Sequence, residues 1–201
     1  MLLKAPFYIQ GKNECGPVSL KMVLEYLGTK KDKEYIKKLV NSESSGTTWT
    51  LGLAKTAAQL GFKVEFYSSI IGFNPKNYEL EYYQKNTDGA RNAETKINKL
   101  LEECRKFGFI LEERSLTIQE ILSKINENCL AIVCLDWSKI VNKDSYVGHF
   151  VPIIGYDEEN VIVHNPGADN PKANLTIKKE LFDIARKAKG TDEDIVFIYR
   201  K

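Results

Sequence analysis

An α+β domain is the fold class that this 201-residue sequence predicts, since helical patterns dominate its first two thirds and strand patterns its last third. Residues 15–27 carry apolar side chains at helical spacing and are followed by Gly28, a residue favoured just beyond a helix C-terminus. Residues 130–135 are continuously apolar, as in a buried strand. Apolar segments on either side of the turn-forming residues 157–160 predict a β-hairpin.

The remaining elements follow from the same periodicities. We expect helices at residues 33–40, 48–60, 78–84, 94–107, 117–126 and 178–187, and strands at residues 62–67, 109–112, 150–156, 161–163 and 195–199. Thr48 should cap the third helix, and Gly61 should end it.

The segment 70–113 differs in character, because it is rich in Asn, Lys, Glu and Tyr. We expect a helical insertion here, within a single domain of residues 1–201. Its two helical patches should form a helical hairpin over the domain that borders a cleft and narrows it. Tyr78, Tyr82 and Tyr83 could then form a substrate wall, or only a helix face. A surface element used for oligomerisation is the alternative for the whole segment.

Composition excludes several classes of function. With 29 Lys and Arg against 27 Asp and Glu, the net charge of +2 gives no field for steering nucleic acid. No run approaches the roughly 18 apolar residues of a membrane span, and the N-terminus lacks a signal peptide, so we expect a cytoplasmic protein with reduced thiols. Four cysteines without a C-x-x-C pair, and only two histidines, argue against a structural zinc site. We expect no metal and no organic cofactor.

Cys15 is the first candidate for chemistry. It lies at the expected N-terminus of the first helix, where unpaired backbone N–H groups and the helix dipole favour a thiolate. Gly16 permits close approach to the sulfur, and Pro17 suits a first turn because it needs no N–H there. A small apolar side chain packed under the helix is the alternative, and helix position alone does not decide between the two.

His149 opens the first strand of the expected hairpin and Asn165 closes the second, so the two side chains should meet. An amide oxygen that accepts from one imidazole nitrogen fixes the tautomer and leaves the other nitrogen for a nucleophile. A core histidine bound to a backbone carbonyl is the alternative. His164 is the rival base, but it precedes Asn165 by one position and should face the other side of the sheet.

Two stretches of the sequence resemble the double-glycine leader peptidases, a branch of the papain-like cysteine peptidases known from the N-terminal domain of bacteriocin exporters. Residues 10–28, QGKNECGPVSLKMVLEYLG, resemble the nucleophile helix of that family, and residues 148–157 with 161–166 resemble its histidine hairpin. The resemblance implies a papain-like fold, in which the nucleophile helix packs on a mostly antiparallel sheet. No transporter segment follows, so we expect a stand-alone member.

The same resemblance implies roles for four residues. Cys15 and His149 match the catalytic pair, Asn165 matches the third residue, and Gln10 matches the oxyanion donor, although it precedes the cysteine by five residues rather than the six common in exporter domains. The implied function is a cysteine peptidase that cleaves a peptide or isopeptide bond in a peptide or protein substrate. An amidase, deamidase or transpeptidase on the same fold, or a non-catalytic peptide-binding module, remains open.

Overall fold

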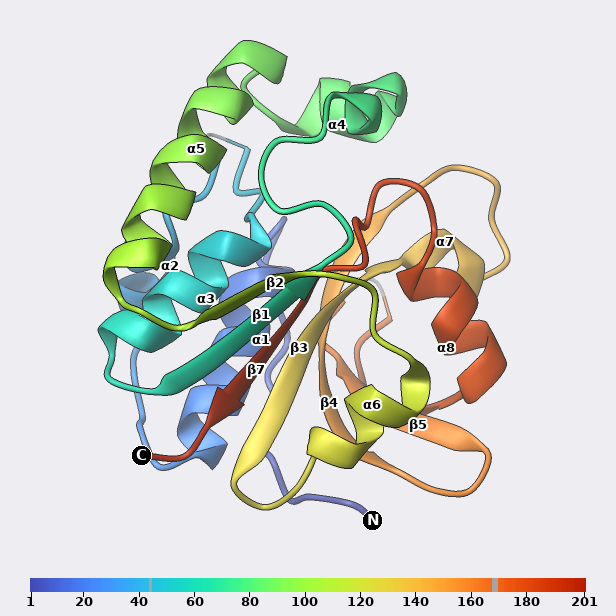
Figure 1. Ribbon diagram of the computed structural model, residues 1–201. Coiled ribbons are helices and arrows are strands. Elements are labelled where there is room, and N and C mark those ends of the chain that lie inside the picture. Colours follow the sequence, from blue (N-terminus) through green and yellow to red (C-terminus); the bar gives the residue numbers. More distant parts are fainter. Residues whose placement is uncertain (44, 168–169) are drawn as a thin grey trace.

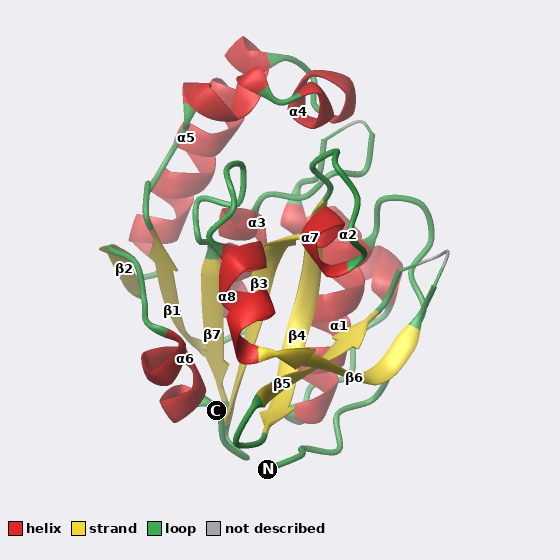
Figure 2. Ribbon diagram, turned by 90° about the vertical axis from the view of Figure 1, so that its right-hand side faces the viewer, coloured by secondary structure: helices red, strands yellow, loops and turns green. Residues whose placement is uncertain are grey.

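The computed structural model describes residues 1–43, 45–167 and 170–201. In these residues a seven-stranded sheet carries helices on both faces (Figures 1 and 2). The helical elements are α1 (Cys15–Tyr26), α2 (Lys33–Val40), α3 (Thr50–Gln59), the 3-10 helix η1 (Pro75–Glu79), α4 (Glu81–Asn86), α5 (Ala90–Lys106), α6 (Ile118–Lys124), α7 (Trp137–Ile140) and α8 (Lys179–Arg186). The strands are β1 (Lys63–Ser68), β2 (Ile110–Glu113), β3 (Cys129–Asp136), β4 (Gly148–Tyr156), β5 (Asn160–Asn165), β6 (Lys172–Lys178) and β7 (Ile195–Tyr199).

The strand order is β2-β1-β7-β3-β4-β5-β6, and every neighbouring pair is antiparallel except β1 with β2. β3 is buried along its whole length, as its continuous apolar run predicts. One apolar core lies between the sheet and α1, α2, α3 and α5, and a second lies between the other face and α6 and α8. The predicted α+β fold class is therefore confirmed.

The first helix packs directly on the strand that carries His149. α1 buries most of its length, and the Ser19 hydroxyl donates to the Phe150 carbonyl of β4 at 3.1 Å. Gly28 has a φ of +99°, the left-handed conformation that its position after the helix predicts. The N-terminus of α1 is thereby held at the edge of the sheet where β4 begins.

Three local predictions differ from the structure. The third helix begins at Thr50 rather than being capped by Thr48, whose hydroxyl instead pairs with the Ser42 hydroxyl at 3.0 Å. The short helix α7 and strand β6 were not expected, because four residues show no helical period and β6 is largely exposed. Such elements depend on their neighbours rather than on their own pattern.

The segment 70–113 divides into parts with different surroundings. Four residues of α5 at helical spacing, Ala93, Ile97, Leu100 and Cys104, are buried, and α5 packs against α3. α4 lies above the upper edge of the sheet, and α5 runs from the same height down along the side of the sheet (Figure 1). Within the expected helical hairpin, α5 thus acts in part as a core helix, because its polar residues cover one face only and the other face joins the core.

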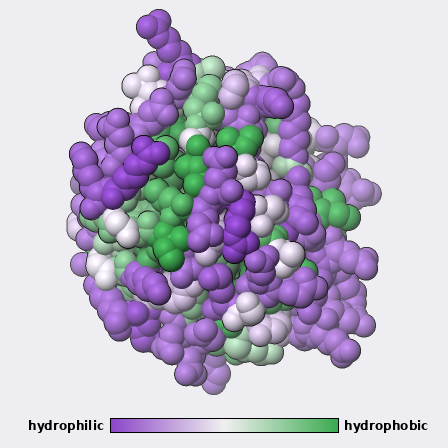
Figure 3. Space-filling model, viewed as in Figure 1, coloured by the Kyte–Doolittle hydropathy of each residue, from purple (hydrophilic) through white to green (hydrophobic). Residues whose placement is uncertain are grey.

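The outer surface in the view of Figure 3 is mostly hydrophilic, with an apolar band near β2. Phe107 and Ile110, at the end of α5 and the start of β2, are among the exposed apolar residues. Among the described helices, none is both long and apolar enough to cross a membrane.

Candidate active site

A cavity opens at the upper edge of the sheet and contains Gln10, Cys15 and His149 together. It encloses about 1140 Å³, counting the part that opens to solvent. Four further parts of the chain contribute to the described walls. They are residues 47–51 at the start of α3, the aromatic residues of η1 and α4, residues 146–148 at the start of β4, and Thr191, Asp192 and Asp194 before β7. Segments that are far apart in sequence thus meet around Cys15, the thiol that the sequence predicts to be reactive.

Cys15 is the first residue of α1 and is partly exposed. Burial raises the pKa of the Cys15 thiol, although backbone N–H groups of Phe150 and Gly16 favour the thiolate. The enclosed geometry therefore opposes the lowering of the pKa that the helix terminus favours. A raised pKa makes the thiol the resting form of Cys15 at neutral pH.

His149 is held by an amide whose own orientation is determined. The Asn165 side-chain nitrogen donates to the Asn170 carbonyl at 2.6 Å, and its Oδ1 accepts from the Gly167 N–H at 2.9 Å. Since this Oδ1 also lies 2.9 Å from His149 Nε2, Nε2 must carry the proton and donate. The lone pair of the neutral ring is consequently on Nδ1. Trp137 packs edge-on against the ring at 4.8 Å.

The charge state of His149 follows from its burial. Burial lowers the pKa of the imidazole to about 4, against a smaller opposing effect of the Asn165 hydrogen bond. His149 is therefore neutral at pH 7, and its Nδ1 is competent to accept a proton.

The contact between His149 and Asn165 is diagonal rather than directly across the hairpin. Ile153 pairs with Val163, so Val151 rather than His149 comes level with Asn165. Both side chains still lie on one face of the sheet, where diagonal neighbours are within reach of long or planar side chains. The expected meeting of the two side chains occurs, by this diagonal route.

His164 points to the other face of the sheet, as its position predicts. Its Nδ1 accepts from the Asn174 N–H at 3.1 Å, and its Nε2 lies 3.1 Å from the Ala5 carbonyl. Because both ring nitrogens bind backbone groups, neither is left for acid–base chemistry. His164 holds the N-terminal segment to β5 and β6.

Gln10 reaches the cavity from that N-terminal segment. Its backbone N–H donates to the Pro166 carbonyl at 2.9 Å, which places it beside the end of β5. The side-chain Oε1 is buried and has no hydrogen-bond partner among the described residues. A polar atom buried in this way within a cavity wall is unusual and is satisfied when a ligand or water binds.

Glu14, which the sequence analysis did not single out, holds the segment between Gln10 and Cys15. Its carboxylate accepts from the Gly11 N–H at 2.9 Å and from Lys33 and Lys37 at 2.7 and 2.6 Å. Burial opposes ionisation, but these lysines outweigh it and lower the pKa of Glu14 to about 2. An acidic residue beside a helix N-terminus was the only signal available in the sequence.

Aromatic residues form one wall of the cavity. Tyr83 of α4 stacks on Trp49 and on Tyr146, with ring centroids 5.9 and 5.8 Å apart. The Tyr82 hydroxyl donates to the Gly148 carbonyl at 3.2 Å, directly before His149. Tyr78 contacts Tyr83 as well. The tyrosines of the segment 70–113 thus contribute to the cavity, and Tyr146 joins them from a distant part of the chain.

A family model described as guanylylate cyclase matches residues 7–198. The chain belongs to this guanylylate cyclase family. A relative, Guanylyl cyclase 1 of Arabidopsis thaliana, is 26% identical over 202 residues, which cover 92% of this chain and 71% of the relative.

The fold is shared with solved peptidase structures. A C39-like peptidase from Bacillus anthracis gives a TM-score of 0.60 at 14% identity, covering 100% of this chain and 98% of the other. The peptidase domain of Streptococcus ComA, a bifunctional ABC transporter, gives 0.54 at 16% identity, covering 98% of each chain. A double-glycine motif protease from an AMS/PCAT transporter, solved in complex with the leader peptide, gives 0.53 at 18% identity, covering 99% and 93%. The predicted papain-like, double-glycine peptidase fold is confirmed.

Proposed function

We propose that the protein is a cysteine hydrolase that cleaves a peptide or isopeptide bond, with Cys15 as nucleophile and His149 as base. The observation that carries the proposal is the hydrogen-bond network of Asn165, which leaves the lone pair of His149 on Nδ1 in the cavity that contains Cys15. The peptidase fold supports it, and a relative solved with a leader peptide supports a peptide as the substrate.

The mechanism follows from the neutral resting state. Cys15 Sγ attacks the scissile carbonyl carbon while its proton passes to His149 Nδ1, which forms imidazolium stabilised by the Asn165 oxygen. The imidazolium then gives that proton to the leaving amine as the C–N bond breaks, and a thioester remains on Cys15. Water attacks the thioester, and His149 takes its proton and returns one to the sulfur, which regenerates the enzyme.

The developing oxyanion requires donors that are already in place. The Cys15 backbone N–H at the start of α1 is one, and the Gln10 side-chain amide is the other in this proposal. Gln10 lines the same cavity. Rotating its side-chain amide by half a turn exchanges the oxygen and the nitrogen, so an N–H can occupy the site of the unpaired oxygen. The five-residue spacing from Gln10 to Cys15 is compatible because Glu14 compacts the intervening turn through Gly11.

A guanylyl cyclase is the second candidate, because the family and its Arabidopsis relative carry that name. GTP brings a triphosphate with its divalent cations. Asp192 and Asp194 line the cavity and suit a divalent cation bound to a nucleotide, but the described residues of the wall contain no Lys or Arg to meet the triphosphate itself. The wall thus fits the nucleotide only in part, whereas Cys15, His149 and Gln10 supply the groups that the hydrolase needs, so the hydrolase is the function that the geometry supports better.

The test is active-site labelling with a peptidyl acyl probe that reacts only with a nucleophilic thiol. Wild-type protein should be acylated at Cys15, and His149→Ala should slow acylation by about 100-fold or more, as expected for a lost general base. Cys134, which lines the same cavity, provides the matched control: Cys134→Ala should label like wild type. Equal labelling of His149→Ala and wild type would refute the role of His149.

The alternatives are separated by the product. A hydrolase releases a carboxylate, whereas a transpeptidase transfers the acyl group to an added amine, and a binding module forms no acyl-enzyme. Cyclic GMP formed from GTP and Mn²⁺ by wild type and Cys15→Ala alike would favour the cyclase instead. We further propose that the segment 70–113 is an insertion in one papain-like domain and selects the substrate through Tyr78, Tyr82 and Tyr83.

A further inference from the structure

Two carboxyl groups lie in the same cavity as Cys15 and His149 and take no part in the proposed reaction. Asp192 and Asp194 precede β7 and line the cavity. The Asp194 carbonyl accepts from the Cys134 N–H at 3.1 Å, and Cys134 pairs with Phe150 across β3 and β4. Strands are about 4.8 Å apart, so the backbones of Asp194 and Phe150 are separated by roughly 10 Å.

Among the described residues these carboxyl groups have neutral hydrogen-bond donors, for Asp194 the side chains of Thr50 and Ser68, but no cationic partner. Asp192 accepts from the side-chain amides of Asn74 and Asn77, each at 2.7 Å, and neither aspartate forms an ion pair with a residue that the structure describes. Burial, and then the charge of Asp192, raises the pKa of Asp194 to about 7. Two like charges in an enclosed space are unfavourable without a counter-charge.

The nearby cations are engaged elsewhere. Arg186 is buried and pairs with Asp183 and Glu193, and its guanidinium also donates to the Leu116 carbonyl. Lys187 pairs with Asp183, and Lys189 pairs with Glu79. None of these three cations lines the cavity.

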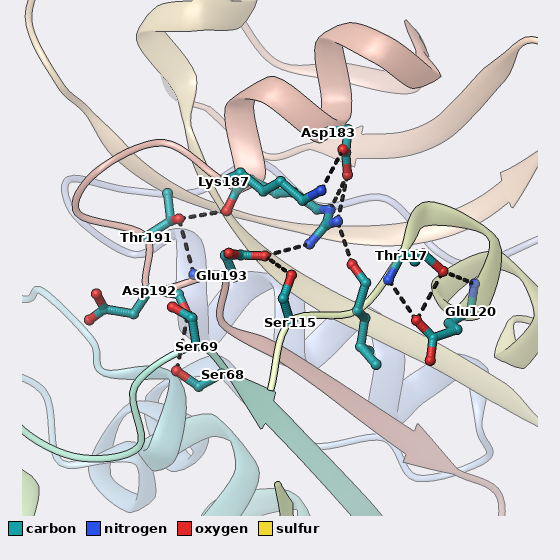
Figure 4. A network of polar contacts seen from close by, with 12 residues as sticks. Ser68, Ser69, Ser115, Thr117, Glu120, Asp183, Lys187, Thr191, Asp192 and Glu193 are labelled. Atoms are coloured by element: carbon teal, nitrogen blue, oxygen red, sulfur yellow. Dashed lines mark hydrogen bonds and ion pairs between the residues drawn. The ribbon is translucent and has the colours of Figure 1, made fainter. Parts of the chain in front are cut away.

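The loop that carries the two aspartates is held rigidly from behind. The Thr191 hydroxyl donates to the Arg186 carbonyl, and the hydroxyls of Ser68 and Ser69 donate to the Asp192 carbonyl. Asp192 and Glu193 have φ values of 49° and 54°, a left-handed conformation that residues with a Cβ rarely adopt. In Figure 4 the Asp192 carboxylate points away from this network, whereas Glu193 points into it. The strained turn therefore separates a structural carboxylate from one that faces the cavity.

The wall beside these aspartates is suited to the same kind of ligand. Tyr78 and Tyr83 line the cavity together with Asn77, whose amide binds Asp192. Aromatic faces attract ammonium and guanidinium groups, and the attraction is stronger where water is excluded. The buried and unpaired oxygen of Gln10 is a separate sign that the polar groups of this cavity are completed by a ligand.

We propose that the cavity binds a substrate through a positively charged group, an ammonium or a guanidinium, which Asp192 and Asp194 receive beside the reacting bond. This inference rests on the proposed hydrolase function and gives it a substrate class. An extended Lys or Arg side chain spans roughly 6–7 Å, and together with the aspartate side chain that meets it this is compatible with the roughly 10 Å between the backbones of Phe150 and Asp194. An unblocked peptide N-terminus carries the same charge and is the other source.

Matched peptides test the proposal. Fluorogenic acetyl-Ala-Ala-X amides with X as Arg, citrulline, Lys or norleucine differ mainly in charge, and each is also made with an unblocked N-terminus. Wild type should show a kcat/KM at least about tenfold higher for Arg than for citrulline, and for Lys than for norleucine. In Asp192→Asn and Asp194→Asn both ratios should approach one. Asp144→Asn, an exposed carboxylate on the loop before Tyr146, is the control and should keep both ratios.

Binding to Cys15→Ala separates this inference from the proposed function. Calorimetry with the same peptides should show at least about tenfold tighter binding of the Arg peptide than of the citrulline peptide, even if no peptide is cleaved. Preference for the unblocked N-terminus, lost in both aspartate variants, would assign the same subsite to an α-ammonium group. Cleavage without any charge preference, or a preference unchanged in both variants, would overturn the acidic subsite while leaving the hydrolase intact. No binding by any peptide would overturn both.

Discussion

Replacing Glu14 by Gln should destabilise the protein in a pH-dependent manner. Glu14 is 8% exposed and receives hydrogen bonds from Lys33, Lys37 and the Gly11 N–H. Its pKa is about 2 in the folded protein against an ordinary value of 4.5, which corresponds to about 3 kcal/mol. Because both lysines are about a third exposed (35% and 34%), solvent screening reduces the expected loss at pH 7 to about 2 kcal/mol.

The sign of the pH dependence follows from the lowered pKa. A carboxylate with a lowered pKa contributes its full stability above pH 4.5 or so and loses it as the pH falls toward 2. The gap in unfolding free energy between wild type and Glu14→Gln should therefore be largest at pH 7 and shrink by about half near pH 3. Urea unfolding followed by circular dichroism at both pH values measures it.

Glu34→Gln is the matched control for this prediction, because Glu34 pairs with the same two lysines but has a side chain that is 62% exposed. Glu34→Gln should lower the unfolding free energy by less than about 0.5 kcal/mol at either pH. The reasoning would be refuted if the two variants lost equal unfolding free energy, or if the loss in Glu14→Gln did not change with pH. Glu14→Gln should also slow acylation of Cys15, since the turn that positions Gln10 loses its anchor.

Three further variants test other parts of the structure. Gly52→Ala should cost about 2 kcal/mol or more in urea unfolding, because an added Cβ would lie 2.4 Å from the Val40 carbonyl oxygen. His164→Leu should cost about 2–4 kcal/mol by leaving two backbone groups unpaired, yet the folded variant should still acylate Cys15, because His164 is not part of the cavity lining. Asp194→Asn should raise the unfolding free energy by roughly 2 kcal/mol at pH 8 and by little at pH 4, because a raised pKa lowers stability as the pH rises through about 7. If Asp194→Asn instead lowered the unfolding free energy at pH 8, Asp194 would not carry a buried charge without a cationic partner, and the acidic subsite depends on that charge.

Local pattern was sufficient for the elements that bury a regular face or end at a distinctive residue. The spacing of apolar residues and Gly28 located α1 within one residue of its observed end, and the run of β3 was predicted as a buried strand. The motifs around Cys15 and His149 predicted the peptidase fold, which is confirmed. Such features are encoded by neighbours in sequence, because helix and strand periodicity act over a few residues.

Long-range packing decided the remainder. Burial raises the pKa of Cys15 where the helix terminus alone predicts a decrease, and that burial comes from segments more than 100 residues apart. In the sequence, Asp192, Glu193 and Asp194 form an ordinary acidic loop. In the structure, Asn74 and Asn77 bind the Asp192 carboxylate and Arg186 binds the Glu193 carboxylate, so the three residues differ in role. Electrostatic energies depend on desolvation and on which charges meet in space. The sequence alone therefore determined the fold and the reacting residues to be tested, whereas the charge states and the acidic subsite exist only in the folded chain.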